Sequence, residues 1–229
     1  MPSERFTLSF GDVALSARLD SPEPGARGSA ILLAHGAGFH MEAPWMERVA
    51  EGLVARGSPV LRFNYPYMER GRASGHGLPP DRQPVLEEAH ALALAALAER
   101  AGERRVLLAG KSMGGRISTY LAAKGERCAG LVLFGYPLHP PKQPAKTRSE
   151  HFPAIAQPAL FLQGTRDEFA ELSLLREALA RYGGRATLEV IEGADHGFHV
   201  PKKSGRTDDE VREFLLDRVV RWERETFPE

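Results

Sequence analysis

Short apolar runs alternate with longer amphipathic segments along most of this chain. Uninterrupted apolar runs are typical of strands covered on both faces, whereas apolar residues three or four apart are typical of helices. The pattern predicts strands at residues 6–10, 13–19, 30–34, 60–63, 106–109, 131–134, 159–162 and 187–191. It predicts helices at residues 44–55, 81–100, 112–124 and 171–181, and a last helix that begins at Thr207 with a capping box to Glu210. Such alternation predicts an α/β protein with a mostly parallel sheet and helices on both faces.

Two segments, residues 65–80 and 136–157, lack this periodicity. The first is rich in glycine, proline and arginine, and the second contains five prolines. Each follows the carboxyl end of a predicted strand, which is the edge where open α/β sheets bind their ligands. We expect both to be irregular loops at that edge. Neither is long enough for a separate cap domain, so we expect a single domain over residues 1–229.

The composition narrows the class of protein without identifying it. Thirty basic residues balance thirty acidic ones, so the chain shows no electrostatic footprint for nucleic acid or an anionic membrane. No apolar run approaches the ~20 residues of a membrane span, and no signal-peptide pattern opens the chain. Cys128 is the single cysteine, which excludes an internal disulfide. We expect a cytoplasmic protein that is monomeric or homodimeric.

The stretch from Gly110 to Gly114 places Ser112 between two glycines, after an apolar run and before a predicted helix. A sharp turn from strand to helix presents a serine in a strained conformation, and small neighbours let the two elements pass closely. A serine hydroxyl is a poor nucleophile unless a base removes its proton. The stretch therefore predicts Ser112 as a nucleophile if an acid and a base follow it.

Both partners stand where this chemistry requires them. Asp167 follows the strand predicted at 159–162, and His196 follows the strand predicted at 187–191. This is the chain order of acid and then histidine that the strand–elbow–helix architecture uses. Asp167 is expected to orient the imidazole, and His196 to take the proton of Ser112 and pass it to the leaving group.

Two other carboxylates compete with Asp167 for the acid role. Asp195 is adjacent to His196, and side chains of neighbouring loop residues rarely point at each other. Glu168 is one residue further along and requires the loop to turn differently. We predict Asp167 as the acid.

The negative charge that develops on the substrate carbonyl oxygen requires two backbone N–H donors. Met113, the residue after the nucleophile, supplies the first at the start of a helix. The second is expected from the loop His35–Gly36–Ala37–Gly38, with Ala37 as the donor and His35 in a structural role.

Two other interpretations of these residues fail on spacing. A phosphate-binding loop requires a glycine five residues before Gly110, and Arg105 stands there instead. The eight histidines form no His-x-x-x-His pair, and the loop from His196 to His199 offers no paired carboxylates. We therefore predict no metal site.

The run from Ala109 to Arg116, together with the loop from His35 to Gly38, resembles the α/β-hydrolase superfamily. The resemblance extends over nearly the whole chain. More narrowly, the chain is similar to the small, capless, dienelactone-hydrolase-like branch and its testis-expressed hydrolase-like members.

The resemblance implies an eight-stranded, mostly parallel sheet without a cap domain, a triad of Ser112, Asp167 and His196, and no cofactor. Dienelactone hydrolases use a cysteine nucleophile, whereas this chain has Ser112, so another substrate is expected. The leading prediction is a serine hydrolase that cleaves a carboxylic ester or thioester of a small molecule through an acyl-enzyme. The alternatives are a non-catalytic interaction module, as some relatives are, and an acyltransferase or peptidase that uses the same triad.

Aromatic residues near the predicted catalytic loops are candidates for an apolar acyl site. As substrate-binding residues we predict Phe39, Tyr65, Tyr136 and Phe198, and further candidates are Met41, Trp45 and Tyr67. The two irregular segments also carry basic residues that could attract an anionic substrate but are more often solvated surface charges: Arg70, Arg72, Lys142, Lys146 and Arg148.

Overall fold

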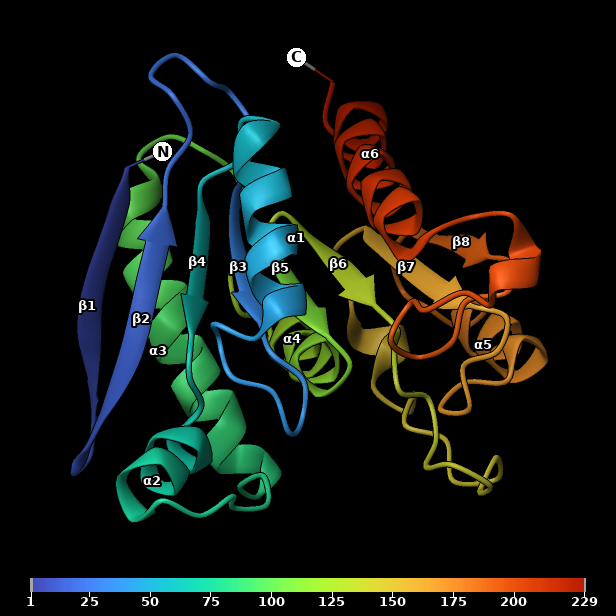
Figure 1. Cartoon of the computed structure of the whole chain (residues 1–229), viewed down its shortest axis with the longest axis horizontal. Coiled ribbons are helices and arrows are strands. Elements are labelled where there is room, and N and C mark those ends of the chain that lie inside the picture. Colours follow the sequence, from blue (N-terminus) through green and yellow to red (C-terminus); the bar gives the residue numbers. More distant parts are fainter. Residues whose placement is uncertain (1, 229) are drawn as a thin grey trace.

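The computed structural model describes residues 2–228, whose arrangement is shown in Figure 1. The strands are β1 Ser3–Phe10, β2 Val13–Asp20, β3 Ala30–Ala34, β4 Val60–Phe63, β5 Val106–Lys111, β6 Gly130–Phe134, β7 Ala159–Gly164 and β8 Ala186–Ile191. The helices are α1 Pro44–Ala55, α2 Pro66–Ser74, α3 Gln83–Ala101, α4 Met113–Ala123, α5 Leu172–Leu179 and α6 Asp208–Thr226, with short 3-10 turns at η1 Phe152–Ala154 and η2 Lys202–Ser204.

Within residues 2–228 the strands form one eight-stranded sheet in the order β1-β2-β4-β3-β5-β6-β7-β8. β2 pairs antiparallel with both β1 and β4. The other neighbours in this order, from β4 and β3 to β7 and β8, pair parallel. The mostly parallel sheet predicted from the sequence is therefore confirmed. The arrowheads of β4 and β6 point to the lower edge of the view in Figure 1, so this is the carboxyl edge of the parallel strands.

Helices cover both faces of the sheet. α1 and α6 lie in front of it in Figure 1, and α3, α4 and α5 lie behind it. Because side chains alternate along a strand, β3 contributes to both cores. Leu33 packs in the core under α1 and α6, and Leu32 packs in the core on the side of α3 and α4.

The end of the chain follows the expected pattern. The hydroxyl of Thr207 accepts a hydrogen bond from the Glu210 N–H, and the Glu210 carboxylate accepts one from the Thr207 N–H. This reciprocal arrangement is the capping box predicted for the last helix, which the structure confirms.

One prediction about the loops is wrong. Residues 66–74, expected to be irregular, form the helix α2. Pro66 fits its first turn, where its missing N–H costs nothing, and Gly75 ends it in the left-handed conformation with φ 71°. Only Pro66 and Tyr67 are buried within α2, so its sequence shows no apolar periodicity. In contrast, η1 is the sole regular element in residues 136–157, all of which the structure describes.

The turn from β5 to α4 packs backbone against backbone. A Cβ atom added at Gly114 would lie 2.4 Å from the Ala34 carbonyl oxygen in β3. A Cβ atom at Gly110 would lie 2.3 Å from the Gly115 nitrogen in α4. Neither neighbour is the end of a flexible side chain, so glycine is required at both positions for α4 to approach β3 and β5.

We expect Gly114→Ala to lower the free energy of unfolding by about 1–3 kcal/mol, because the added methyl forces α4 away from β3. The measurement is urea unfolding followed by circular dichroism. The matched control is Gly77→Ala, since no atom lies within 4 Å of a Cβ at Gly77. Equal stability of the two variants would contradict this account of the turn.

Candidate active site

Ser112 lies in a strained turn between β5 and α4. Its backbone angles are φ 51° and ψ −115°, a region that residues with side chains rarely adopt. The Ser112 N–H donates to the Phe134 carbonyl oxygen at 3.0 Å, which ties the turn to the end of β6. Ser112 is partly exposed, although Lys111 and Met113 on either side are buried. The turn thus holds the serine at the carboxyl edge of the sheet.

Two hydrogen bonds join Ser112, His196 and Asp167 in one chain. His196 Nε2 lies 2.9 Å from Ser112 Oγ, and His196 Nδ1 lies 2.7 Å from Asp167 Oδ2. Because an ionised carboxylate can only accept, Nδ1 carries the proton and Nε2 is the acceptor that faces the serine hydroxyl. The three side chains follow the carboxyl ends of β5, β7 and β8, and the structure brings all three together.

The two competing carboxylates are engaged elsewhere. Asp195 Oδ1 accepts hydrogen bonds from the N–H groups of Gly197 at 2.8 Å and His199 at 3.0 Å. These bonds close the turn that carries His196. Glu168 is exposed, whereas Asp167 is buried. Geometry therefore favours Asp167 over both alternatives as the partner of His196.

The sequence analysis missed Gln163, a fully buried residue in β7. Its Nε2 donates to Asp167 Oδ2 at 2.6 Å, and its Oε1 accepts from the Tyr136 N–H at 2.9 Å. The Phe169 N–H donates to the other carboxylate oxygen, Asp167 Oδ1, at 2.8 Å. Gln163 thereby links Asp167 to the loop after β6. The available signal was a polar residue at the end of an otherwise apolar strand.

The two predicted oxyanion donors belong to segments that adjoin Ser112. Met113 is the first residue of α4, where a backbone N–H has no partner within the helix. Ala37 is exposed in the loop after β3. A Cβ added at the neighbouring Gly36 would lie 3.4 Å from the Ser112 Cβ, so this loop runs directly against the serine. Among the hydrogen bonds of residues 2–228, neither N–H acts as a donor.

His35 supports this loop from within the core, in the structural role expected for it. Its Nδ1–H donates to the Gly36 carbonyl oxygen at 2.9 Å, and its Nε2 accepts from the Tyr65 N–H at 3.2 Å. One donor and one acceptor on the same ring require neutral imidazole. Burial lowers the pKa of His35 to about 4, in agreement with a neutral ring at physiological pH.

The end of β4 anchors the far side of the same loop. Asn64 Oδ1 accepts from the Met41 N–H, and Arg62 donates to the Met41 carbonyl oxygen, both at 2.8 Å. Arg62 is fully buried and also donates to Asp20 Oδ2 of β2 at 2.7 Å. Burial raises the pKa of Asp20, but the hydrogen bonds from Arg62, Ser3 and Arg18 together with the charge of Arg62 outweigh it, and the net shift is downward. The loop with Ala37 is therefore held at both ends.

Lys111, next to Ser112, is a second residue that the sequence analysis did not single out. Its side chain is buried, and Nζ donates to the His196 carbonyl oxygen. Nζ also lies 5.3 Å from the ring centre of Phe198 and 5.8 Å from that of Trp45, within the range of cation–π attraction. Lys111 thereby ties the strand before Ser112 to the loop that carries His196.

The four predicted substrate-binding residues occupy different environments. Phe39 is exposed in the loop after β3. The expectation that Tyr65 and Tyr136 contact substrate needs correction, because both are buried. The Tyr65 hydroxyl lies 2.8 Å from His90 Nδ1, and the Tyr136 hydroxyl donates to the Arg148 carbonyl oxygen. Phe198 is also buried, and its ring stacks on Trp45 at a centre distance of 6.3 Å.

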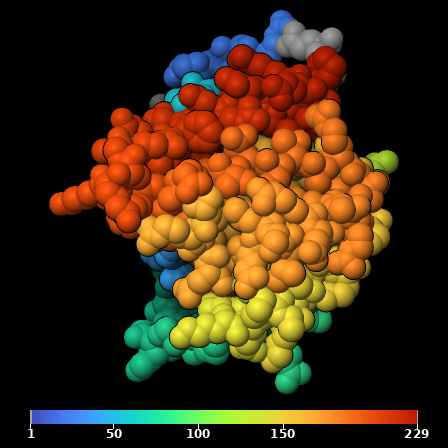
Figure 2. Space-filling view, turned by 90° about the vertical axis from the view of Figure 1, so that its right-hand side faces the viewer, coloured from blue at the N-terminus to red at the C-terminus, as the bar shows by residue number. Residues whose placement is uncertain are grey.

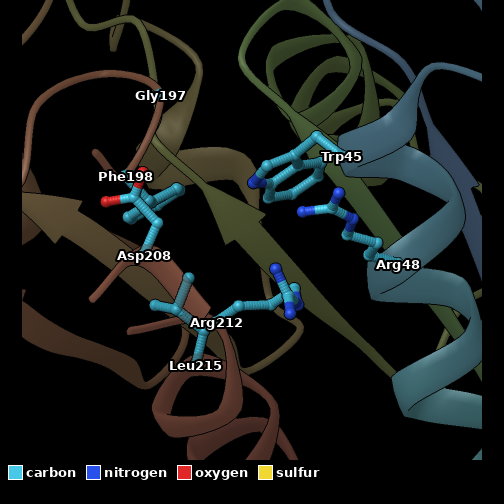
Figure 3. Close-up of a pocket in the computed structure, with 7 residues that line it drawn as sticks. All are labelled: Trp45, Arg48, Gly197, Phe198, Asp208, Arg212 and Leu215. Carbon is cyan, nitrogen blue, oxygen red and sulfur yellow. The ribbon is translucent and has the colours of Figure 1, made fainter. Parts of the chain in front are cut away.

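A cavity of about 150 Å³ lies behind the histidine loop, between α1 and α6. Figure 3 shows Trp45 and Arg48 of α1 on one side and Arg212 and Leu215 of α6 on another, with Gly197, Phe198 and Asp208 completing the wall. Both arginines pair with the carboxylate of Asp209, at 3.8 Å for Arg48 and 2.8 Å for Arg212. Ser112 is not among the lining residues, and the cavity is separate from the serine.

Two kinds of feature are absent from residues 2–228. No helix in this range has both the length and the apolar character that crossing a membrane requires. No group of His, Cys, Asp and Glu in the same range is arranged to hold a metal ion.

Comparison with known proteins gives consistent results. The family model described as an alpha/beta hydrolase domain matches residues 27–224. A dienelactone hydrolase from Anabaena variabilis is 22% identical with a TM-score of 0.75, and the alignment covers 94% of this chain and 95% of that chain. An α/β serine hydrolase homologue from Coxiella burnetii is 21% identical with a TM-score of 0.73, covering 94% and 96%. A lidless α/β serine hydrolase from Xanthomonas campestris is 22% identical with a TM-score of 0.70, covering 96% and 94%.

The buried Lys111 makes stability depend on pH. Burial lowers the pKa of Lys111 to about 8 against the opposing attraction of Asp167 and Asp195. In the unfolded chain the lysine has a pKa of about 10.4. Between these values the unfolded state binds the proton more tightly, so the contribution of Lys111 to stability rises with pH, by at most about 1.4 kcal/mol per pH unit.

We therefore expect the stability of the wild type relative to Lys111→Met to increase between pH 8 and pH 10. Urea unfolding of both proteins at several pH values measures the difference. Lys202→Met, which removes an exposed lysine, is the matched control. A difference that stays constant or falls across this range would show that burial does not perturb Lys111.

Proposed function

Because the chain belongs to the α/β-hydrolase family, we propose that it is a serine hydrolase that cleaves a carboxylic ester or thioester of a small molecule. We propose Ser112 as the nucleophile, His196 as the general base and acid, and Asp167 as the residue that orients the imidazole. The observation that carries this proposal is the hydrogen-bonded chain from Ser112 Oγ through both nitrogens of His196 to Asp167 Oδ2.

In the first half of the reaction, Ser112 Oγ attacks the substrate carbonyl carbon. His196 Nε2 takes the hydroxyl proton as the C–O bond forms, and the carbonyl π electrons move to oxygen. The C=O bond then re-forms and the bond to the leaving group breaks, while the imidazolium donates this proton to the departing oxygen or sulfur, which leaves as an alcohol or thiol. The product is an acyl-enzyme on Ser112, and the carboxylate of Asp167 stabilises the positive ring throughout.

In the second half, water takes the place of the leaving group. His196 Nε2 removes a proton from the water as its oxygen attacks the acyl carbon, and later returns a proton to Ser112 Oγ. The free acid leaves, and the enzyme regains its starting state. Both halves pass through a tetrahedral oxyanion, for which the N–H groups of Met113 and Ala37 are the proposed donors.

The surroundings of His196 support this proton transfer. The Phe169 ring lies against the imidazole at a centre distance of 4.3 Å, which limits rotation of the ring. The Lys111 ammonium holds the His196 backbone, and Gln163 holds the carboxylate. A general base is efficient only when it stays within hydrogen-bond distance of the proton it removes. Phe39, exposed in the loop after β3, is proposed to supply apolar contact for the acyl group.

A fluorophosphonate probe tests the proposed nucleophile. We expect the folded wild type to be labelled on Ser112, and Ser112→Ala and His196→Ala to lose labelling. The same substitutions should lower kcat/KM for p-nitrophenyl esters by roughly 10⁴-fold or more, because the three residues act as a unit. Ser9→Ala, which removes an exposed hydroxyl in β1, is the matched control.

The panel of p-nitrophenyl esters should span short to long acyl chains, so that acyl preference is measured together with turnover. Folded wild type that is neither labelled nor active on any ester of the panel would contradict the proposal. Equal turnover by the wild type and Ser112→Ala would contradict it as well.

A further inference from the structure

Two arginines next to the serine elbow have no acidic partner. Arg116 belongs to α4, and its N–H donates to the Ser112 carbonyl oxygen at 3.0 Å. One helical turn separates the two residues, a rise of about 6 Å along the axis. Arg148 lies in the loop after β6. Among residues 2–228, no carboxylate forms an ion pair or hydrogen bond with either guanidinium, and Arg116 Nε is buried without a hydrogen-bond partner.

Side-chain contacts bring α4 and the loop of Arg148 together. His151 Nε2 lies 2.8 Å from Thr119 Oγ1, and Thr119 Oγ1 donates to the Arg116 carbonyl oxygen at 2.6 Å. The rings of His151 and Tyr120 lie 4.2 Å apart. On the loop side, the Arg148 N–H donates to the Leu138 carbonyl oxygen at 2.7 Å, which fixes the backbone of Arg148. Both arginines are partly buried in the resulting contact.

The surroundings of the two arginines do not neutralise them. Burial and the charge of Arg116 together lower the pKa of Arg148, as expected for neighbouring like charges. Burial raises the pKa of Tyr120, so its hydroxyl is neutral at physiological pH. Burial also lowers the pKa of His151 to about 4, so this ring adds no charge. Two positive charges therefore remain without compensation.

The nearby acidic residues do not provide that compensation. Glu87 forms an ion pair with Lys124 at the far end of α4. Glu150 is exposed and makes no ion pair within the described residues. Of the other basic residues in the irregular segments, Arg70 is paired with Asp81, and Arg72, Lys142 and Lys146 are exposed. A partly buried arginine pair without a carboxylate has the donors and charge that bind an oxyanion.

The position of this pair relates it to the proposed chemistry. Tyr136 follows β6, and a Cβ at the preceding Gly135 would lie 3.4 Å from His196 Nδ1. The loop that carries Arg148 therefore begins against the histidine and runs along α4. In Figures 1 and 2 the segment after β6, coloured yellow, lies at the lower end of the molecule, as does the teal segment that contains α2. This is the carboxyl edge, where Ser112 lies.

We propose that Arg116 and Arg148 form an oxyanion-binding site beside Ser112, and that the preferred substrates are esters carrying a carboxylate or phosphate group. The substrate preference rests on the ester hydrolysis that we propose at Ser112. The ester bond is cleaved at the serine while the negatively charged group is held by the two guanidinium groups. Neutral esters of the same length are poorer substrates, because they leave the two charges unpaired.

Matched esters test the proposal. Mono-p-nitrophenyl glutarate and p-nitrophenyl valerate have acyl chains of equal length and differ in the terminal carboxylate. A second pair, p-acetoxybenzoate and p-acetoxybenzamide, places the carboxylate or a neutral amide of the same size on the leaving group instead. We expect wild type to favour the anionic member of at least one pair. Arg116→Met and Arg148→Met should lower the anionic-to-neutral ratio of kcat/KM by roughly 10- to 100-fold.

Three further variants complete the design. Arg116→Lys keeps the charge but loses the forked donors, so it should retain part of the preference. Arg127→Met removes an exposed arginine before β6, at the opposite edge of the sheet, and should leave the ratio unchanged. Thermal unfolding establishes that each variant is folded. A ratio that is the same in wild type, Arg116→Met and Arg148→Met would overturn the proposal while leaving ester hydrolysis intact.

Measuring the binding of anions tests the arginine site independently of ester hydrolysis. If Ser112 is not labelled by a fluorophosphonate and no ester is cleaved, hydrolysis fails as the function. The oxyanion site is then judged by titration calorimetry with glutarate and with inorganic phosphate. Binding to wild type that is lost in Arg116→Met and Arg148→Met supports the site and identifies the preferred anion. Absence of binding by both anions overturns it.

Discussion

The close contact between α4 and strands β3 and β5 is the constraint on which the site depends. With no side chain at Gly110 and Gly114, the backbone of α4 lies against Ala34 and turns out of β5 in one residue. That residue is Ser112, and its φ of 51° follows from the sharpness of the turn. The same contact sets Met113 N–H at the start of a helix and brings the loop after β3 against the serine. Strain at one residue is thus balanced by packing over three elements.

Buried polar groups then hold the loops in place around this turn. Gln163 connects Asp167 to the loop after β6, Lys111 connects the elbow to the histidine loop, and Arg62 connects β4 to the loop after β3. Each is a polar or charged group in the core, which costs stability unless its hydrogen bonds are made. Each also joins a loop to another part of the chain with which that loop forms no β-sheet hydrogen bonds. Buried polarity therefore concentrates at the carboxyl edge, where precise loop placement is required.

The sequence predicted much of this arrangement and missed its supports for physical reasons. Apolar runs indicate strands, and glycines indicate close backbone contacts. The sheet, the turn at Ser112 and the order of Asp167 and His196 could therefore be predicted from short stretches of sequence. The roles of Gln163 and Lys111 could not, because Gln163 links Asp167 to Tyr136 and Lys111 binds the carbonyl group of His196. Tyr136 and His196 are distant in sequence from these residues and become their neighbours only in the folded sheet. Tyr65 follows a strand end, as a substrate-contacting residue would, but its side chain turns inward to His90. The polar helix α2 lacked the periodicity by which helices are recognised.

The acyl-enzyme is the central claim, and mass spectrometry of the acid-quenched protein and its peptides tests it most directly. The protein is mixed with p-nitrophenyl butyrate, quenched in acid during turnover and digested to locate any adduct. The account predicts that one butyryl group is added to the peptide containing Ser112 and disappears once the ester is exhausted. Release of p-nitrophenol with no adduct, or with the butyryl group on a different residue, would contradict it.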